Sequence, residues 1–365
     1  MSTKSSNSNL HRAAKVKNDE FYTRLVDIEK ELKHYKDQFR GKVVYCNCDD
    51  PFESNFFKYF AGNFNALGLK RLIATSYKPS PIANTELVLQ SSLLPGYEDK
   101  VVQKPSKPKG RPKVTANKFI INEVSDIDGD GAFDLRDIAE QLKANKNNEW
   151  APLELEGDFR SEESIELLKQ ADIVVTNPPF SLFREYVKQL VEHKKKFLII
   201  GSDNARKYQD IFKLVQENKL WPGYSRVNEF MQPDGTVKKF GNVGWFTNLD
   251  VSKRHELLTL YKKYSPDEFP KYDNYDAIEV SKVSDIPVDY KGVMGVPITF
   301  LDKYNPEQFE ILGMSDNRDP NYEYRTKLYT QEDSPQYNDL NRGTVLKIKG
   351  ELKSTYTRLL IKAKK

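Results

Sequence analysis

Residues 172–180 read DIVVTNPPF, and this stretch decides the fold class. A short run of β-branched residues favours a buried strand, and it ends at Asn177. Pro178 and Pro179 cannot continue a central strand, because proline has no amide hydrogen to donate. A strand that stops at a rigid turn is typical of the sheet edge where α/β proteins bind ligands. A proline turn with a purely structural role remains the alternative interpretation.

Outward from this stretch, apolar runs alternate with segments of helical periodicity. The predicted strands are 42–47, 71–77, 196–201 and 244–251, and the predicted helices are 27–39, 161–170 and 181–193. This alternation indicates βαβ units and a parallel sheet. Residues 78–118, rich in Pro, Ser and Lys, depart from the pattern, and the βα rhythm is absent beyond residue 251.

The bulk composition is that of a soluble globular protein. The chain has 365 residues, of which 38% are hydrophobic and 30% charged. No apolar run approaches the length of a membrane span, and the N-terminus lacks the hydrophobic stretch of a signal peptide. Cys46 and Cys48 are too close together for a stabilising disulfide and too few for a zinc site, so we expect a reducing, cytoplasmic location.

Basic residues are concentrated locally, although the net charge is only +4. Three tracts, residues 1–17, 101–118 and 341–365, are rich in Lys and Arg, and Glu351 is their one acidic residue. Such tracts can neutralise phosphates and release counterions when nucleic acid binds. Solvated, flexible segments are the alternative interpretation for each tract.

The turn Asn177-Pro178-Pro179-Phe180 suits methyl transfer to a planar amine. The exocyclic amine of adenine is a poor nucleophile, because its lone pair is delocalised into the ring. The Asn177 side-chain oxygen and the following backbone carbonyl can accept hydrogen bonds from this amine and direct its lone pair at an incoming methyl group. The prolines hold the turn rigid, and Phe180 can stack on an extruded base. Catalysis would then depend mainly on positioning.

Several long stretches resemble the EcoRI-type adenine-specific DNA methyltransferases. They are KNDEFYT (17–23), KVVYCNCDDP (42–51), SNFFKYF (54–60), DFRSEESIELLKQADIVVTNPPFSLFREY (158–186), KKFLII (195–200), WFTNLDV (245–251), KYDNYDAI (271–278) and YKGVMGVPITFLDKYNPEQFE (290–310). The resemblance covers about two-thirds of the chain. It implies a DNA substrate, S-adenosylmethionine as methyl donor, and a mostly parallel methyltransferase sheet with a helical layer on each face.

The same resemblance implies a set of cofactor-binding residues. Its members are Phe21, Tyr22 and Thr23 in a segment that closes over the methionine end, Asp49 and Asp50 after the first strand, and Asp158 with Phe159 at the adenine. The loop after the first strand lacks the glycines common in the family and has Ser54, Asn55 and Phe56 instead. The departure leaves the choice between the two acids open. The strand at 71–77 shows no acid for the ribose hydroxyls.

A Gly-Arg-Pro core lies outside the resemblance. Residues 107–113 read KPKGRPK, and Lys109, Gly110, Arg111 and Pro112 resemble the part of an AT-hook that lies in a narrow minor groove. A basic, Pro-rich linker is the alternative.

An acidic, glycine-containing loop also lies outside the resemblance. Its acids, at the spacing of an EF-hand calcium loop, are Asp126, Asp128, Asp130, Asp134 and Asp137. The sequence therefore indicates either a Ca²⁺ site or an acidic turn.

Together these features predict a Rossmann-like S-adenosylmethionine-dependent methyltransferase fold, α/β in class, with a C-terminal target-recognition subdomain. We expect an arm and cofactor-closing segment over 1–40, a catalytic domain over 41–251 with an inserted excursion at about 78–150, and a target-recognition region over 252–365.

The predicted function is adenine-N6 methylation of double-stranded DNA in a restriction–modification system. The resemblance implies that the methylated DNA sequence is GAATTC or a related one, and that a cognate restriction endonuclease is the partner. We expect a monomer that does not associate with membranes. A protein glutamine-amide methyltransferase and a non-catalytic DNA-binding protein on a methyltransferase scaffold are the alternatives.

Overall fold

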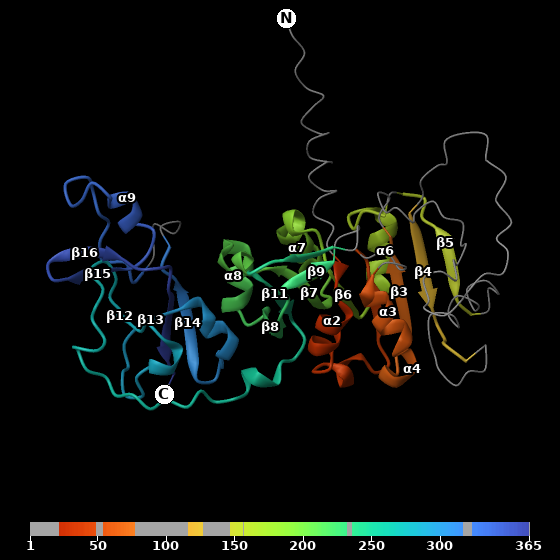
Figure 1. Ribbon diagram of the computed structural model, residues 1–365, viewed down its shortest axis with the longest axis horizontal. Coiled ribbons are helices and arrows are strands. Elements are labelled where there is room, and N and C mark those ends of the chain that lie inside the picture. Colours follow the sequence, from red (N-terminus) through yellow and green to blue (C-terminus); the bar gives the residue numbers. More distant parts are fainter. Residues whose placement is uncertain are drawn as a thin grey trace, which may run out of the picture. The chain divides into compact units, whose positions relative to one another are not determined.

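A computed structural model describes most of the chain, which forms two compact units (Figure 1). The described residues are 22–48, 54–76, 116–126, 147–155, 157–231, 236–316 and 323–364. The first unit comprises Met1–Ile211 and Gly223–Leu249, and the second comprises Phe212–Pro222 and Asp250–Lys365. No helix in the described ranges combines the length and hydrophobicity needed to cross a membrane.

An eight-stranded sheet in the order β5-β4-β3-β2-β6-β7-β11-β8 forms the centre of the first unit. Its strands are β2 (Val43–Cys46), β3 (Arg71–Thr75), β4 (Asn117–Ile121), β5 (Glu149–Pro152), β6 (Ile173–Thr176), β7 (Lys196–Ser202), β8 (Trp221–Arg226) and β11 (Val243–Thr247). Strands β3, β2, β6 and β7 are parallel, whereas β4, β5 and β11 pair antiparallel to their neighbours. The sheet is therefore mixed, and the expectation of a mostly parallel sheet holds for its central strands.

Two layers of helices cover this sheet. The described helices of four or more residues in the first unit are α2 (Leu25–Leu32), α3 (Asn55–Gly62), α4 (Phe64–Leu67), α6 (Glu162–Gln170) and α7 (Phe183–Glu192), with the 3-10 turns η1 (Lys36–Phe39) and η4 (Asp203–Lys207). Helix α8 (Gln209–Gln216) begins in the first unit and ends in the second, and the second unit contains α9 (Tyr337–Leu340) and the 3-10 turn η7 (Ile298–Lys303). Every residue of β2, β6 and β11 is buried, as expected for strands covered on both faces.

Ring contacts assign the helices α3 and α7 to opposite faces of the sheet. Phe56 of α3 packs edge-on against Trp245, with ring centroids 5.9 Å apart, and Phe183 of α7 packs against Phe246 at 4.9 Å. Because neighbouring residues of a strand point to opposite faces, Trp245 and Phe246 place these helices on the two sides. A helical layer on each face is therefore present in the structure.

The predicted helix over 27–39 is divided in the structure. Helix α2 ends at Leu32, and the separate 3-10 turn η1 follows. Glu31, which is fully buried, accepts hydrogen bonds from the Tyr35 hydroxyl and from the backbone amides of Tyr224 and Ser225 on β8. Gly223 permits this close approach, since a Cβ there would lie 2.2 Å from Glu31 Oε1. These hydrogen bonds to Tyr35 and to β8 stabilise the turn where the helix ends.

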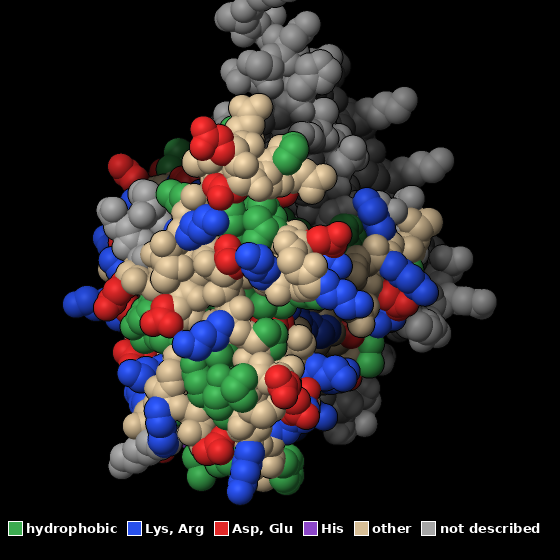
Figure 2. Space-filling view, turned by 90° about the vertical axis from the view of Figure 1, so that its left-hand side faces the viewer, with side chains coloured by type: hydrophobic (Ala, Val, Ile, Leu, Met, Phe, Trp, Pro, Cys, Tyr) green, Lys and Arg blue, Asp and Glu red, His purple; other side chains and the backbone are tan. Residues whose placement is uncertain are grey.

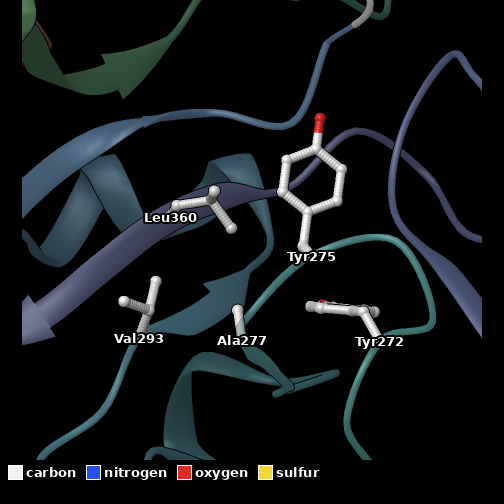
Figure 3. Close-up of a cluster of buried hydrophobic side chains, with 5 residues drawn as sticks. All are labelled: Tyr272, Tyr275, Ala277, Val293 and Leu360. Carbon is white, nitrogen blue, oxygen red and sulfur yellow. The ribbon is translucent and has the colours of Figure 1, made fainter. Parts of the chain in front are cut away.

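The second unit is built around a four-stranded sheet in the order β12-β13-β17-β14. The strands are β12 (Ile278–Glu279), β13 (Met294–Val296), β14 (Phe309–Met314) and β17 (Leu359–Ala363), and a separate hairpin pairs β15 (Val345–Ile348) with β16 (Glu351–Ser354). Figure 3 shows one of its apolar clusters, made by Tyr272, Tyr275, Ala277, Val293 and Leu360. This core brings together segments that are up to 88 residues apart in sequence (Tyr272 to Leu360, 360 − 272 = 88).

Candidate active site

The site lies where the central parallel strands end. Strands β2 and β6 are neighbours, but the chain leaves β2 for β3 on one side and reaches β6 only later on the other side. Ligands of open α/β sheets bind at such a switch point, outside the carboxyl ends of the strands. Asn47 directly follows β2 and Asn177 directly follows β6, so both asparagines stand at this point.

The sequence Asn177-Pro178-Pro179-Phe180 forms a tight corner between β6 and α7. Pro179 has φ −55° and ψ 123°, and its carbonyl accepts a 3.0 Å hydrogen bond from the Leu182 amide. Asn177 is half-buried, and its side-chain oxygen is shielded from solvent. Phe180 is also half-buried, so the corner presents an amide and an aromatic ring together. This arrangement has the chemical groups that the sequence predicted for holding a planar amine.

A small sheet in the order β1-β9-β10 lies beside this corner. Its strands are β1 (Tyr22–Thr23), β9 (Glu229–Met231) and β10 (Val237–Lys239). Thr23 pairs with Phe230 of β9, and the buried Phe230 ring meets the Phe180 ring edge-on, with centroids 6.3 Å apart. The structure therefore brings the sequence-predicted Tyr22 and Thr23 to the same region as the corner.

Thr23 also has a buried polar atom that suits a ligand. The residue is 3% exposed, and no hydrogen-bond partner for its side-chain hydroxyl is found among the described residues. Its backbone oxygen accepts a 2.7 Å hydrogen bond from the Asn55 amide at the start of α3. Because buried hydroxyl groups are normally hydrogen-bonded, Thr23 Oγ1 fits a group supplied by a small molecule.

Asn47 and Tyr186 are further candidate site residues that the sequence did not predict. The Tyr186 hydroxyl, from α7, donates a hydrogen bond to Asn47 Oδ1, and both residues are buried. The Thr75 hydroxyl at the end of β3 donates to the Asn47 backbone oxygen at 3.4 Å. Asn47 thereby connects β2, β3 and the helix that follows the corner. The sequence signal that could have identified Asn47 is its position as a polar residue at the end of the apolar run 42–47.

Asp158 has an internal partner in Arg160. The Asp158 carboxylate accepts hydrogen bonds from the Arg160 backbone amide at 2.9 Å, from Nε at 2.9 Å and from Nη2 at 2.6 Å. Burial raises the pKa of Asp158, but these bonds outweigh it and hold that pKa below its ordinary value. Phe159, only 5% exposed, packs edge-on against Tyr186 at 5.0 Å. Phe159 of the predicted acid–aromatic pair therefore packs against α7, whose Tyr186 also bonds to Asn47.

Other predicted site residues lie outside the described ranges. They are Phe21, Asp49, Asp50, the AT-hook-like residues Lys109, Gly110, Arg111 and Pro112, and the loop acids Asp128, Asp130, Asp134 and Asp137. Asp126 is described, but no cluster of three or more acidic, His or Cys side chains within the described ranges could hold a metal. Neither the structure nor the relatives support the predicted Ca²⁺ site.

The chain matches a known family along almost its whole length. Residues 9–364 match the family described as "Adenine-specific methyltransferase EcoRI". The Escherichia coli protein named "Type II methyltransferase M.EcoRI" is 45% identical over 332 residues, covering 86% of this chain and 90% of the relative.

Two mycoplasma proteins are also similar. "Type II methyltransferase M.MpnI" of Mycoplasma pneumoniae is 36% identical and covers 96% of this chain and 97% of the relative. "Type II methyltransferase M.MgeORF184P" of Mycoplasma genitalium is 35% identical, covering 96% and 98%. No solved structure matches the chain significantly. The chain is an adenine-specific DNA methyltransferase and belongs to the EcoRI methylase family.

Proposed function

We propose that this methyltransferase uses the corner Asn177–Phe180 to hold an adenine extruded from double-stranded DNA, while a methyl group passes to its N6 amine. The Asn177 side-chain oxygen and the Pro178 carbonyl accept hydrogen bonds from the two amine hydrogens. These bonds oppose delocalisation of the lone pair and direct it toward the donor. Phe180 stacks on the base, and the prolines keep the acceptors in position without reorganisation.

S-adenosylmethionine is the donor that the family implies, and the described residues fit it. Thr23, Asn47 and the Asp158–Phe159 pair offer a buried hydroxyl, an amide, a carboxylate and an aromatic ring for it, and Asn47 directly follows β2 at the switch point between β2 and β6. When bound, S-adenosylmethionine supplies a methyl group on a sulfonium, which is electrophilic without metal activation. Tyr22, Phe21 and one of Asp49 and Asp50 complete the proposed set from the resemblance.

The finer fold assignment is part of the same proposal. A parallel centre, helices on both faces and a ligand site at a switch point support a Rossmann-like methyltransferase domain. We assign target recognition to residues 252–365 and propose GAATTC or a related sequence as the site. A cognate restriction endonuclease as partner follows from the same resemblance, and the monomeric state and the cytoplasmic location expected from the sequence are part of the proposal.

The placement of Asn177 at the carboxyl end of β6, with its side-chain oxygen buried, carries the proposal. Asn177→Ala should lower the rate constant of methyl transfer roughly 100- to 1000-fold, in the range seen when one fixed polar group of an active site is removed. The measurement is transfer of labelled methyl from S-adenosylmethionine to duplex DNA, followed by mapping of N6-methyladenine.

Asn338→Ala is the matched control, because Asn338 is an exposed asparagine on α9. Cofactor and DNA binding, measured separately, should persist in Asn177→Ala. Full activity of that variant would refute the assigned role. Label appearing in protein and not in DNA would contradict the proposed substrate.

A further inference from the structure

Some basic residues of the C-terminal tract 341–365 form ion pairs, and others are exposed to solvent. Arg358 is largely buried and donates from Nη2 to Glu279 Oε1 at 2.8 Å, so its charge is compensated inside the second unit. Arg342 pairs with Asp339 at 3.1 Å. The lysines of the β15–β16 hairpin, Lys347, Lys349 and Lys353, are exposed, and Lys353 lies 3.8 Å from the carboxylate of Glu351 on the same strand. Three exposed lysines of this tract therefore lie on one short element, while Lys362 on β17 and Lys364 after it are exposed elsewhere.

The base of this hairpin is firmly anchored. Val345 is fully buried in a cluster with Tyr329 and Leu340, and Leu352 of the opposite strand packs against the same cluster. Asn274 Oδ1 accepts a 2.8 Å hydrogen bond from the Val345 amide. The pairing of Ile348 with Glu351 closes the hairpin at its other end. Because the base of the hairpin is buried and its turn is exposed, the hairpin projects from the second unit in a fixed direction.

The turn has an unusual residue at its first central position. Lys349 has φ +52° and Gly350 has φ +84°, the positive values that a type I′ turn requires. Asn, Asp or Gly is preferred at the first position, because a longer side chain is strained in the left-handed region. A lysine there therefore sets a positive charge at the tip at some cost in stability. Ile348, adjacent to it, is 42% exposed.

Figure 2 shows the side of the molecule on which β15 and β16 lie in Figure 1. Lysine and arginine side chains are spread over this face, with acidic and hydrophobic side chains among them. Exposed basic residues are therefore common here, and what distinguishes the hairpin is its geometry. It combines three lysines with one acid, Glu351, on a narrow two-stranded ribbon.

We propose that the β15–β16 hairpin enters the major groove of the DNA substrate. An antiparallel ribbon has the width that this groove admits, and it can carry side chains to base edges and to both phosphate backbones. Lys347 and Lys349 contact phosphates, and Ile348 faces base edges, where an apolar side chain can meet a thymine methyl group. The inference rests on the proposed function in taking duplex DNA as the partner.

The first test measures binding of a fluorescent duplex of about 30 base pairs by anisotropy at several salt concentrations. Lys347→Ala with Lys349→Ala should weaken binding at least tenfold. The slope of log affinity against log salt should fall by about 2, since each phosphate contact contributes about 0.9. Ile348→Ala should weaken binding to the preferred sequence more than binding to unrelated duplex. S-adenosylmethionine affinity should not change.

The matched control is Lys282→Ala with Lys291→Ala, which removes two exposed lysines from the same unit. An equal loss of affinity and of salt slope in control and hairpin variants would overturn the proposal. Protection of guanine N7 from methylating reagent, which reports on the major groove, should be lost only in the hairpin variants. Protection that persists in the hairpin variants would also overturn the proposal.

Lys349→Gly separates binding from folding. Glycine relieves the positive φ, so the melting temperature should stay the same or rise while DNA affinity falls. Unchanged affinity with a raised melting temperature would contradict a role in binding.

Failure of the proposed function has a different signature. If Asn177→Ala methylates DNA at the wild-type rate, the role proposed for the corner fails, while the hairpin is still judged by binding alone. If the wild type methylates DNA and the hairpin variants bind it normally, only the hairpin proposal fails.

Discussion

At the scale of single residues, the site depends on side chains held by neighbours rather than on unusual acids or bases. Tyr186 fixes Asn47, Arg160 fixes Asp158, and the prolines fix Asn177. This suits a reaction in which positioning supplies most of the rate enhancement. The residue types of the corner could be predicted from sequence. The Asn47–Tyr186 bond could not, because it joins residues 139 positions apart.

The Asp158–Arg160 pair predicts a pH effect on stability. The pKa of the folded Asp158 carboxyl lies below its ordinary value, so the pair stabilises the protein above that value. This contribution is lost as pH falls through the lowered pKa, when the carboxyl becomes protonated. The difference in unfolding free energy between wild type and Asp158→Asn should be constant above about pH 5 and shrink below about pH 4. Denaturant titrations at a series of pH values measure it, and a difference that grows toward low pH would contradict the assignment.

At the scale of elements, the sequence predicted the strands that carry the site. Strands expected at 42–47, 71–77, 172–177 and 196–201 are confirmed as β2, β3, β6 and β7. Each of these strands is a continuous apolar run, which is the sequence pattern of a strand buried on both faces. Strands β4 and β5 were missed within the excursion. Strand β5 reads EWAP and lies at the sheet edge, where burial is incomplete and proline is tolerated.

The contact between β7 and α7 gives an element-scale prediction. A Cβ on Gly201 would lie 2.4 Å from Phe183 Cε2, at the first residue of the helix that follows the corner. Gly201→Ala should therefore cost about 1–3 kcal/mol of stability through overpacking and should lower the methyl-transfer rate by displacing the corner. Melting curves and single-turnover rates measure the two effects. Phe183→Leu in the same chain should restore both, and failure of this rescue would show that the clash is not the cause.

At the scale of the whole molecule, the chain divides into two compact units, and the second has apolar clusters of its own. The second unit lacks the alternation of strands and helices, and its sheet combines segments distant in sequence. Periodicity within a short window cannot reveal such pairing, which explains why the sequence predicted only a separate region there. The functional class could be predicted from the sequence, because the corner and the strand before it are contiguous in the chain.

The buried pair Glu279–Arg358 allows a test of whether the two units unfold separately. Glu279→Ala leaves Arg358 uncompensated and should destabilise the second unit by about 3–5 kcal/mol. Hydrogen exchange should become faster in β12, β13, β14 and β17, with little change in β2, β6 and β7 of the first unit. The exposed Glu310→Ala on β14 serves as the control. Equal acceleration in both units would show that they unfold together.

The pairing of β1 with β9 has a kinetic consequence. Tyr22 and Thr23 meet Met231 and Phe230 through a ladder only two residues long, whereas β7 and β11 pair along five. Short ladders separate by local fluctuation far more readily than long ones. We therefore expect the β1–β9 pairing beside the corner to open more readily than the β7–β11 pairing, which would give a bound small molecule a way out while the large sheet stays folded.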